Sequence, residues 1–461
     1  MQLPILQVII PIIAAMFCSL AKKHKSAWFI SFITTVATLT ISSVLLVKAY
    51  KGEIITYNVG DWEPPYGIEL RIDLLNSMIL TLVNFIALIS VLYSFHINEK
   101  EISQNRITGF YSLFLLCLGG LLGILATNDI FNLYVFLEVA SLSSYALVSM
   151  GQDKKALVAA FEYLVSGTIG ATFYLFGIGL LYSMTGTLNM SDMAERIVPL
   201  YDNKIVQLGT LFIFVGLSIK MALFPLSKWL VNAYSYAPSF VSIFFSGTAT
   251  KVMIYVFIRI FYSIFHQNIF LFKSPFIYIV TTLALCAIIF GSIFAIIADN
   301  TKKLLANSSV SQIGYIVLAL SLNSKAGLFA AILHTINHSI IKTSLFMAAS
   351  EKSISCYARL AFTVSGLALI GVPLTSGFIS KWYMMKALIE SHAWSSFIIF
   401  ILGSFLALIY MWKVIEKMQC SENNNTAQPI MVLCLLLMTG LTVITGIYSA
   451  PIRLAIEKFA F

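Results

Sequence analysis

Long apolar runs constrain this chain more than any other feature of its sequence. Fourteen stretches of roughly 18 residues or more, the length that crosses a bilayer as a helix, follow one another with short polar segments between them. The sequence therefore predicts an all-α integral membrane protein in which 1–461 forms a single membrane domain. The predicted spans are 3–21, 27–48, 72–95, 109–126, 130–150, 157–184, 206–229, 238–263, 275–297, 304–322, 326–349, 360–387, 395–413 and 428–448.

Composition excludes the main soluble alternatives. Only 11% of the 461 residues are charged and 59% are hydrophobic, whereas a soluble domain has about 25% charged residues to cover its core. The net charge of +9 is spread in small groups between apolar runs, without the basic stripe of a nucleic-acid-binding protein. The cysteines are scattered, with no spacing typical of a metal or redox site.

Basic residues set the predicted orientation. Lys22, Lys23 and Lys25 follow the first apolar run, whereas a cleaved secretory signal has its basic residues first. We therefore expect a retained first helix whose basic end lies in the cytoplasm. An even number of crossings then places both termini outside.

Charged residues inside the apolar runs are the most informative positions. Each costs about 2.5–3.5 kcal/mol near the bilayer centre, so they must pair, become neutral or face water. Two of them have a structural explanation: Arg259 is close enough to a helix end to reach the surface, and Glu162 is near Lys154 and Lys155. The charges in question are Glu138, Glu162, Lys220, Lys251, Arg259, Lys342 and Lys381.

Glu138, Lys220 and Lys251 lie too close to mid-span to reach water easily. One lysine–carboxylate pair at about 4 Å is worth about 4 kcal/mol at an effective dielectric near 20. Making or breaking such a pair can load and release a proton. A buried ion pair that only fixes packing is the alternative interpretation.

Two apolar runs carry helix breakers beside a lysine. Pro225 follows Lys220 and cannot continue the hydrogen bonding of a helix. Gly371 and Pro373 interrupt the run that carries Lys381. Broken helices at membrane depth line cavities or lie buried in protein, and one in each half of the chain indicates an inverted repeat.

A polar stripe marks the run 326–349. His334, His338 and Lys342 are spaced four residues apart, which places them on one helix face. Such a stripe is typical of a proton relay, although histidines bonded within a packed core are the alternative. A zinc site is disfavoured because Thr335 stands where the helical zinc signature needs glutamate.

Several blocks resemble the proton-translocating antiporter-like family, which includes Mrp-type cation/proton antiporter subunits and complex I membrane-arm subunits. The blocks are NDIFNLYVFLEVASLSSY (128–145), GLSIKMALFPLSKWL (216–230), TKVMIYVFIR (250–259), DNTKKLLANSSVSQIGYI (299–316), HTINHSIIKTSLF (334–346) and GVPLTSGFISKW (371–382). The resemblance implies a proton path through Glu138, Lys220, Lys251, His334, His338, Lys342 and Lys381. The stretch 159–194 is most similar to the D-type subunit of the Mrp antiporters.

This resemblance implies the fold and setting of the chain. The fold would have fourteen helices: 1–108 with helices 1–3, a first five-helix repeat at 109–263, a second inverted repeat at 275–413, and helix 14 at 428–448. Helices 7 and 12 would be broken. The protein would sit in a bacterial plasma (inner) membrane as one subunit of an antiporter complex, moving protons and monovalent cations such as Na⁺. We expect no cofactor, no bound metal and no enzymatic activity of its own.

Some positions depart from the family pattern. The block usually similar to LPDAYPAAPSPVS is LVNAYSYAPSFVS at 230–242, with changes at Val231, Asn232, Ser235 and Phe240. Glu162 stands where the family has lysine, and Ser227 where it has histidine. These changes concern the loop geometry and the cytoplasmic access.

Three alternatives stay open at this stage. A subunit of a redox-driven complex, related to complex I or to a hydrogenase, would have the same motifs and differ in its partners. A stand-alone transporter of an organic solute would need no partner subunits. An assembly subunit without transport would keep the fold and not need the charges.

Overall fold

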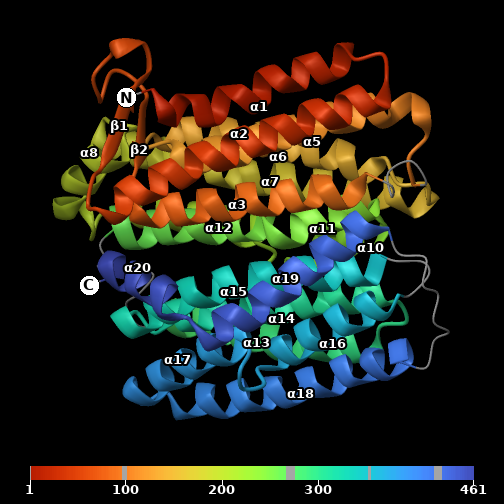
Figure 1. Cartoon of the computed structure of the whole chain (residues 1–461). Helices are drawn as coiled ribbons and strands as arrows, with labels where there is room; N and C mark the ends of the chain where they lie inside the picture. The colour runs from red at the N-terminus through yellow and green to blue at the C-terminus, as the bar shows by residue number, and fades with distance from the viewer. Residues whose placement is uncertain (1, 96–100, 266–275, 351–354, 420–427, 461) are drawn as a thin grey trace.

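The computed structural model describes residues 2–95, 101–265, 276–350, 355–419 and 428–460. Long helices run side by side across the molecule, with α1 and α2 along one side and α17 and α18 along the opposite one (Figure 1). Helix α1 begins and α20 ends at the same end of the molecule, which also carries the strands (Figure 1).

Helices account for nearly all of the elements, in both halves of the chain. The N-terminal part contains α1 (Leu3–Leu20), α2 (His24–Tyr50), β1 (Ile55–Asn58), η1 (Val59–Asp61), β2 (Glu69–Ile72), α3 (Leu74–Ser94), η2 (Gln104–Arg106), α5 (Ile107–Ala126), α6 (Ile130–Ser149), α7 (Lys154–Thr185), α8 (Met190–Arg196), η3 (Val198–Leu200), α9 (Lys204–Lys220), α10 (Lys228–Tyr236), α11 (Ser239–Gly247), α12 (Ala249–Ile258) and η4 (Arg259–Ile264). The remainder contains α13 (Phe276–Ile297), α14 (Thr301–Ser321), α15 (Lys325–Ser350), α16 (Cys356–Ile370), α17 (Ser376–Glu390), α18 (Trp394–Gln419), α19 (Pro429–Ile447) and α20 (Ala450–Ala460).

The helical membrane fold predicted from the apolar runs is confirmed. Within the described residues, 11 helices are long and apolar enough to cross a membrane. The predicted span 360–387 is divided between α16 and α17, and in the span 206–229 the helix α9 ends at Lys220, before α10 begins at Lys228. The span 326–349 is the polar-striped α15. The count of fourteen crossings and the inverted repeats stay predictions.

One polar segment between helices forms strands. Parts of the stretch 49–72 fold into an antiparallel hairpin of β1 and β2, in which Ile55 pairs with Ile72. In β2, the buried residues Leu70 and Ile72 alternate with the more exposed Glu69 and Arg71, which is the pattern of a strand with one face on the core. The hairpin brings Glu69 to Asn128 and Arg71 to Ser191, two residues close to the starts of α6 and α8.

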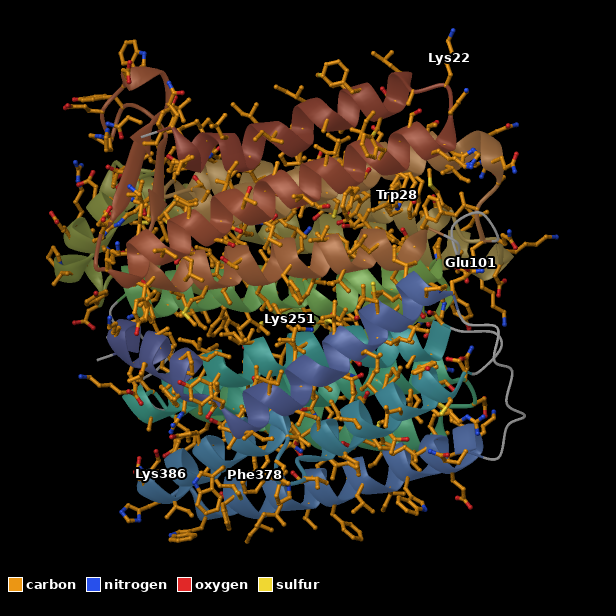
Figure 2. The ribbon with its side chains drawn as sticks, viewed as in Figure 1. Lys22, Trp28, Glu101, Lys251, Phe378 and Lys386 are labelled. Carbon is orange, nitrogen blue, oxygen red and sulfur yellow. The ribbon has the colours of Figure 1, made fainter. Side chains whose placement is uncertain are left out.

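Burial separates the central helices from the peripheral ones. In the most apolar stretch of α14, 100% of the residues are buried, and in that of 239–264 the share is 94%. The corresponding share is 39% in each of α1, α7, α13 and α18. Central helices are therefore shielded by protein on all sides, and the peripheral ones present apolar side chains outward. Lys251 lies midway along the molecule, in this shielded centre (Figure 2).

Candidate functional site

Helix α9 ends at Lys220, as Pro225 predicted. Ala222 adopts a left-handed conformation with φ +59°, and proline has no N–H to continue the helix. The chain becomes helical again at Lys228, where α10 begins. Lys220 is consequently the last residue of a helix that stops inside the protein, and it is 7% exposed.

The second predicted break is also present. Helix α16 ends at Ile370, and Gly371 follows with φ +95°. Glycine is required there because a side chain would be strained at this φ, and a Cβ would come within 2.9 Å of the Lys381 side chain. Pro373 then precedes α17, which carries Lys381.

A third break was not predicted. The run 238–263 reads as one apolar helix, but α11 ends at Gly247 and Thr248 has φ −121° and ψ −62°. Its only local signal is the pair of poor helix formers Gly247 and Thr248, and glycine is common in membrane helices. Lys251 follows the break by one helical turn.

In the first half of the chain, Lys220 contacts three side chains of α6. Its Nζ donates to Ser141 Oγ at 2.8 Å and to Tyr145 OH at 3.4 Å, and lies 3.9 Å from Glu138 Oε1. Glu138 and Lys220, two of the charges that lie inside the apolar runs, thus form an ion pair. Glu138 Oε1 itself is buried and has no hydrogen bond within the described residues, so the pair is loose.

Two further lysines bind the carbonyl ends of broken helices. Lys251 donates to the backbone oxygen of Ser246, near the end of α11. Lys381 donates to the backbone oxygen of Ile370, the last residue of α16, at 2.8 Å, and to Ser404 Oγ at 3.2 Å. The last carbonyls of a helix lack partners within that helix and carry partial negative charge. The breaks therefore supply acceptors for a buried ammonium group.

Lys342 is held differently, by side chain and backbone of α14. Its Nζ donates to Leu305 O at 2.7 Å and to Ser308 Oγ at 2.5 Å. Within the part of the chain that the structure describes, no carboxylate lies within ion-pairing distance of Lys251, Lys342 or Lys381. The expectation that buried charges pair with opposite charges is thus met at Lys220 alone among these lysines.

The polar stripe of α15 faces the protein interior. His334 shares hydrogen bonds of 2.9 Å with Ser380 Oγ and with Gln312 Oε1. His338 is 1% exposed, and neither of its ring nitrogens has a hydrogen bond within the described residues. The two imidazole rings are parallel with centroids 6.0 Å apart. The alternative of histidines bonded within a packed core fits His334 but not His338.

Packing brings these groups into one region. Lys251 of α12 lines a small cavity together with Ile332 and Thr335 of α15, the helix that carries the polar stripe. Within the stripe, His334 neighbours Tyr315, whose ring lies 5.1 Å from Lys381 Nζ. The tertiary structure therefore brings the predicted residues of α12, α15 and α17 together in the centre of the fold.

Glu162 has partners other than those expected. It pairs with Lys228 at 3.5 Å and accepts a hydrogen bond from Asn232 Nδ2 at 2.5 Å, so the predicted pairing with Lys154 and Lys155 was wrong. Both Glu162 and Asn232 depart from the family pattern. The structure places these two departures in direct contact with each other.

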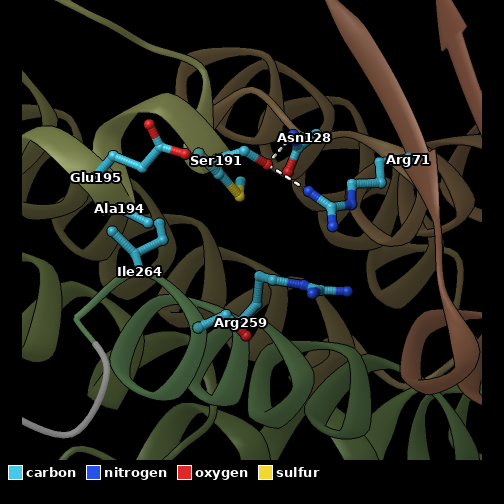
Figure 3. A pocket seen from close by; sticks show the side chains of 9 residues that line it. Arg71, Asn128, Ser191, Ala194, Glu195, Arg259 and Ile264 are labelled. Carbon is cyan, nitrogen blue, oxygen red and sulfur yellow. Dashed lines mark hydrogen bonds between the residues drawn. The ribbon is translucent and has the colours of Figure 1, made fainter. Parts of the chain in front are cut away.

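Arg259 is also placed differently from the sequence expectation. Its side chain is 14% exposed, and Nη2 lies 2.6 Å from Asp73 Oδ2. The Nε donates to Tyr255 OH at 3.1 Å. The side chain lies at the wall of a pocket of about 340 Å³, which Arg71 of β2 also lines (Figure 3). Arg259 is thus a buried ion-paired residue and does not extend freely to the surface, a contact that sequence reasoning missed because Asp73 is far away in the chain.

Together, the fold and these contacts define a polytopic membrane protein with a buried series of titratable side chains. The family model described as "NADH:quinone oxidoreductase/Mrp antiporter, TM" matches residues 127–407, a range that contains all seven predicted site residues. The chain belongs to this family of membrane subunits.

Two curated relatives illustrate the breadth of the family. NADH-quinone oxidoreductase subunit N of Desulforudis audaxviator is 40% identical, covering 90% of this chain and 86% of its own length. The D-type subunit of an Na⁺/H⁺ antiporter from Alkalihalophilus pseudofirmus is 29% identical, covering 98% of this chain and 95% of its own length.

Two solved structures have the same fold. A chain of the membrane-bound sulfane sulfur reductase, an archaeal respiratory membrane complex, superposes with TM-score 0.91 and 29% identity, with 100% of this chain and 97% of that chain covered. A chain of the Mrp complex from Dietzia sp. superposes with TM-score 0.90 and 22% identity, with coverage of 100% and 96%.

Proposed function

We propose that this chain translocates protons through its buried Glu, Lys and His series, as an ion-translocating subunit of a multisubunit monovalent cation (Na⁺)/proton antiporter. The observation that carries the proposal is the arrangement of Lys251, Lys342 and Lys381. Each is buried with neutral acceptors and no carboxylate within ion-pairing distance in the described residues. A purely structural lysine would be stabilised by a fixed counter-charge, which these positions lack.

The contacts support the following proton path. Lys220 exchanges a proton under the influence of Glu138, because approach of the ammonium to the carboxylate favours its charged form. Lys251 passes the proton toward α15, where His338 has both ring nitrogens available. His334, Ser380 and Gln312 continue the series toward Lys381 at the second broken helix.

Proton transfer along such a series needs small movements only. The ammonium of Lys220 is 2.8 Å from Ser141 but 3.9 Å from Glu138, so one side-chain rotation changes its partner. An ion pair at about 4 Å contributes about 4 kcal/mol at an effective dielectric near 20. This free energy is large enough to drive loading and release of a proton.

The antiporter assignment is supported by the likeness, over most of the chain, to relatives named as antiporter subunits. Its test is isolation of the complex from the native membrane. We expect small antiporter subunits to co-purify, and proteoliposomes of the complex to exchange Na⁺ for protons. Recovery of the chain without partners, together with binding of an organic solute, would overturn this assignment.

A redox-driven complex is the second candidate, favoured by the 40% identity to a subunit named for NADH-quinone oxidoreductase. The same buried series would then move protons when partner subunits transfer electrons. Co-purification of subunits that carry flavin or iron–sulfur clusters would decide for this candidate. Proton uptake that requires an electron donor would confirm it.

A further inference from the structure

The two histidines of the α15 stripe differ in how their rings are held. The Nδ1 of His334 lies 2.9 Å from Ser380 Oγ of α17, and its Nε2 lies 2.9 Å from Gln312 Oε1 of α14. These three side chains are buried. His338, one turn further along α15, has no hydrogen bond at either nitrogen within the described residues. Side chains of two other helices therefore orient the ring of His334 but not that of His338.

The contact with Gln312 determines which nitrogen of His334 carries the hydrogen. An amide oxygen only accepts hydrogen bonds, so the Nε2 that faces Gln312 Oε1 must be protonated. In the neutral ring, Nδ1 then keeps its lone pair and is the basic atom. If the amide faced the ring with its NH₂ group instead, the single hydrogen would lie on Nδ1, and no lone pair would be left for a second proton.

Ser380 accommodates both protonation states of His334 at Nδ1. Its hydroxyl has one hydrogen, which it donates to Nδ1 while that nitrogen is unprotonated. When Nδ1 gains a proton, the ring donates to Ser380 Oγ, and the hydroxyl hydrogen can turn to Gly377 O, 3.1 Å away on the same helix. Gln312 Oε1 accepts from Nε2 in both states. His334 can thus be protonated at Nδ1 without loss of a ring hydrogen bond.

We propose that Gln312 is a positioning residue that reserves Nε2 of His334, so that this histidine takes up and releases protons at Nδ1 alone, through the Ser380 hydroxyl. In uptake, the hydroxyl gives its hydrogen to Nδ1 and receives one from an ammonium group of the series, which leaves no charge on the oxygen. This inference rests on the proposed function, since it assigns roles within the same proton path. A ring that exchanges at one atom holds a proton between transfers, whereas His338 can receive a proton on one nitrogen and release it from the other.

The tautomer of His334 is the first test. Nitrogen NMR of the intact complex with labelled histidines distinguishes a protonated from an unprotonated ring nitrogen. The chain has six histidines, and the signal of His334 is the one that disappears in His334→Gln. We expect wild-type His334, in its neutral form, to carry its hydrogen on Nε2. A hydrogen on Nδ1 with a bare Nε2 would overturn the proposal.

Variants of Gln312 test whether this residue sets the tautomer. Gln312→Met removes the acceptor at similar volume, and should give a mixture of tautomers and about tenfold slower proton transport in proteoliposomes. Gln312→Glu presents acceptors only, so Nε2 should stay protonated even though the added charge slows transport. The control is Ser311→Ala, a buried neighbour bonded to Ser292 of α13, which should change neither property.

Ser380→Ala tests the exchange at Nδ1 separately. It removes the hydroxyl but not the contact with Gln312, so transport should fall about tenfold while Nε2 stays protonated. Unchanged transport in Ser380→Ala would overturn the assigned route through the hydroxyl.

The outcomes separate this inference from the proposed function. A single Nε2–H tautomer in Gln312→Met, with wild-type transport, would overturn the role of Gln312 and leave the function intact. If Gln312→Met fails to assemble, the tautomers of wild type and of Gln312→Glu decide. Wild-type complex that moves no protons while His334 keeps its hydrogen on Nε2 would overturn the function and the exchange at Nδ1, but not the tautomer.

Discussion

Lys220 Nζ lies closer to the hydroxyl of Ser141, at 2.8 Å, than to the carboxylate of Glu138, at 3.9 Å. A permanent structural salt bridge would instead form the shorter, charge-assisted contact. The ammonium therefore has two alternative partners on α6 within reach of one side-chain rotation.

Glu138→Gln is expected to lower proton translocation about tenfold or more without affecting assembly. The amide keeps the shape of the side chain but removes the charge that favours the loaded form of Lys220. The measurement is dye-reported exchange in proteoliposomes. Ser141→Ala is the matched control, since it removes the other partner and leaves the charge; a larger loss in Ser141→Ala than in Glu138→Gln would contradict the assigned role of the carboxylate.

Lys342→Met should abolish transport while leaving the protein as stable as wild type or more stable. Methionine fills a similar volume, and removing an unpaired buried charge recovers its desolvation cost, about 1–3 kcal/mol. Thermal aggregation of the detergent-solubilised complex reports the stability. Lys413→Met, which changes an exposed lysine bonded to Ile296 O, should alter neither property. A strongly destabilised Lys342→Met would instead show that Lys342 serves the packing of α14 and α15.

Asn232→Asp is expected to weaken the contact between α7 and α10. It places a second carboxylate within 2.5 Å of Glu162, where like charges repel. Adding Glu162→Lys should restore stability, because the two positions then carry opposite charges. A double-mutant cycle on thermal stability measures the coupling, with an expected size of about 1 kcal/mol or more. Additive effects would show that the two departures from the family pattern are not coupled.

Gly216→Ala should destabilise the packing of α7 on α9 by about 1–3 kcal/mol. A Cβ at this position would come within 2.6 Å of Gly170 O and 2.8 Å of Tyr174 N. Backbone atoms cannot move aside as a flexible side chain can. Gly179→Ala on α7 is the control, since nothing lies within 4 Å of its added Cβ. Equal melting temperatures for the two variants would contradict the close approach of these helices.

The sequence by itself determined the membrane environment and most of the helical segments. Apolar runs are long enough to read without tertiary information, since burying polar residues in lipid is costly. The two breaks at Pro225 and Gly371 could also be predicted, because proline lacks an N–H and glycine permits a left-handed backbone. Each of the charged positions inside the runs was identified in the same way.

Only the tertiary structure decided what those charges contact. Helical periodicity places His334, His338 and Lys342 on one face, but it does not reveal that Lys251 of α12 lies against the same helix. The partners of Lys381 and Arg259 are 11 and 186 residues away in the chain. Contacts between helices that are apolar on all sides leave no periodic signal in one sequence. The hydrogen bonds that accommodate a buried lysine without a carboxylate, at the ends of α11 and α16, exist only once the chain has folded.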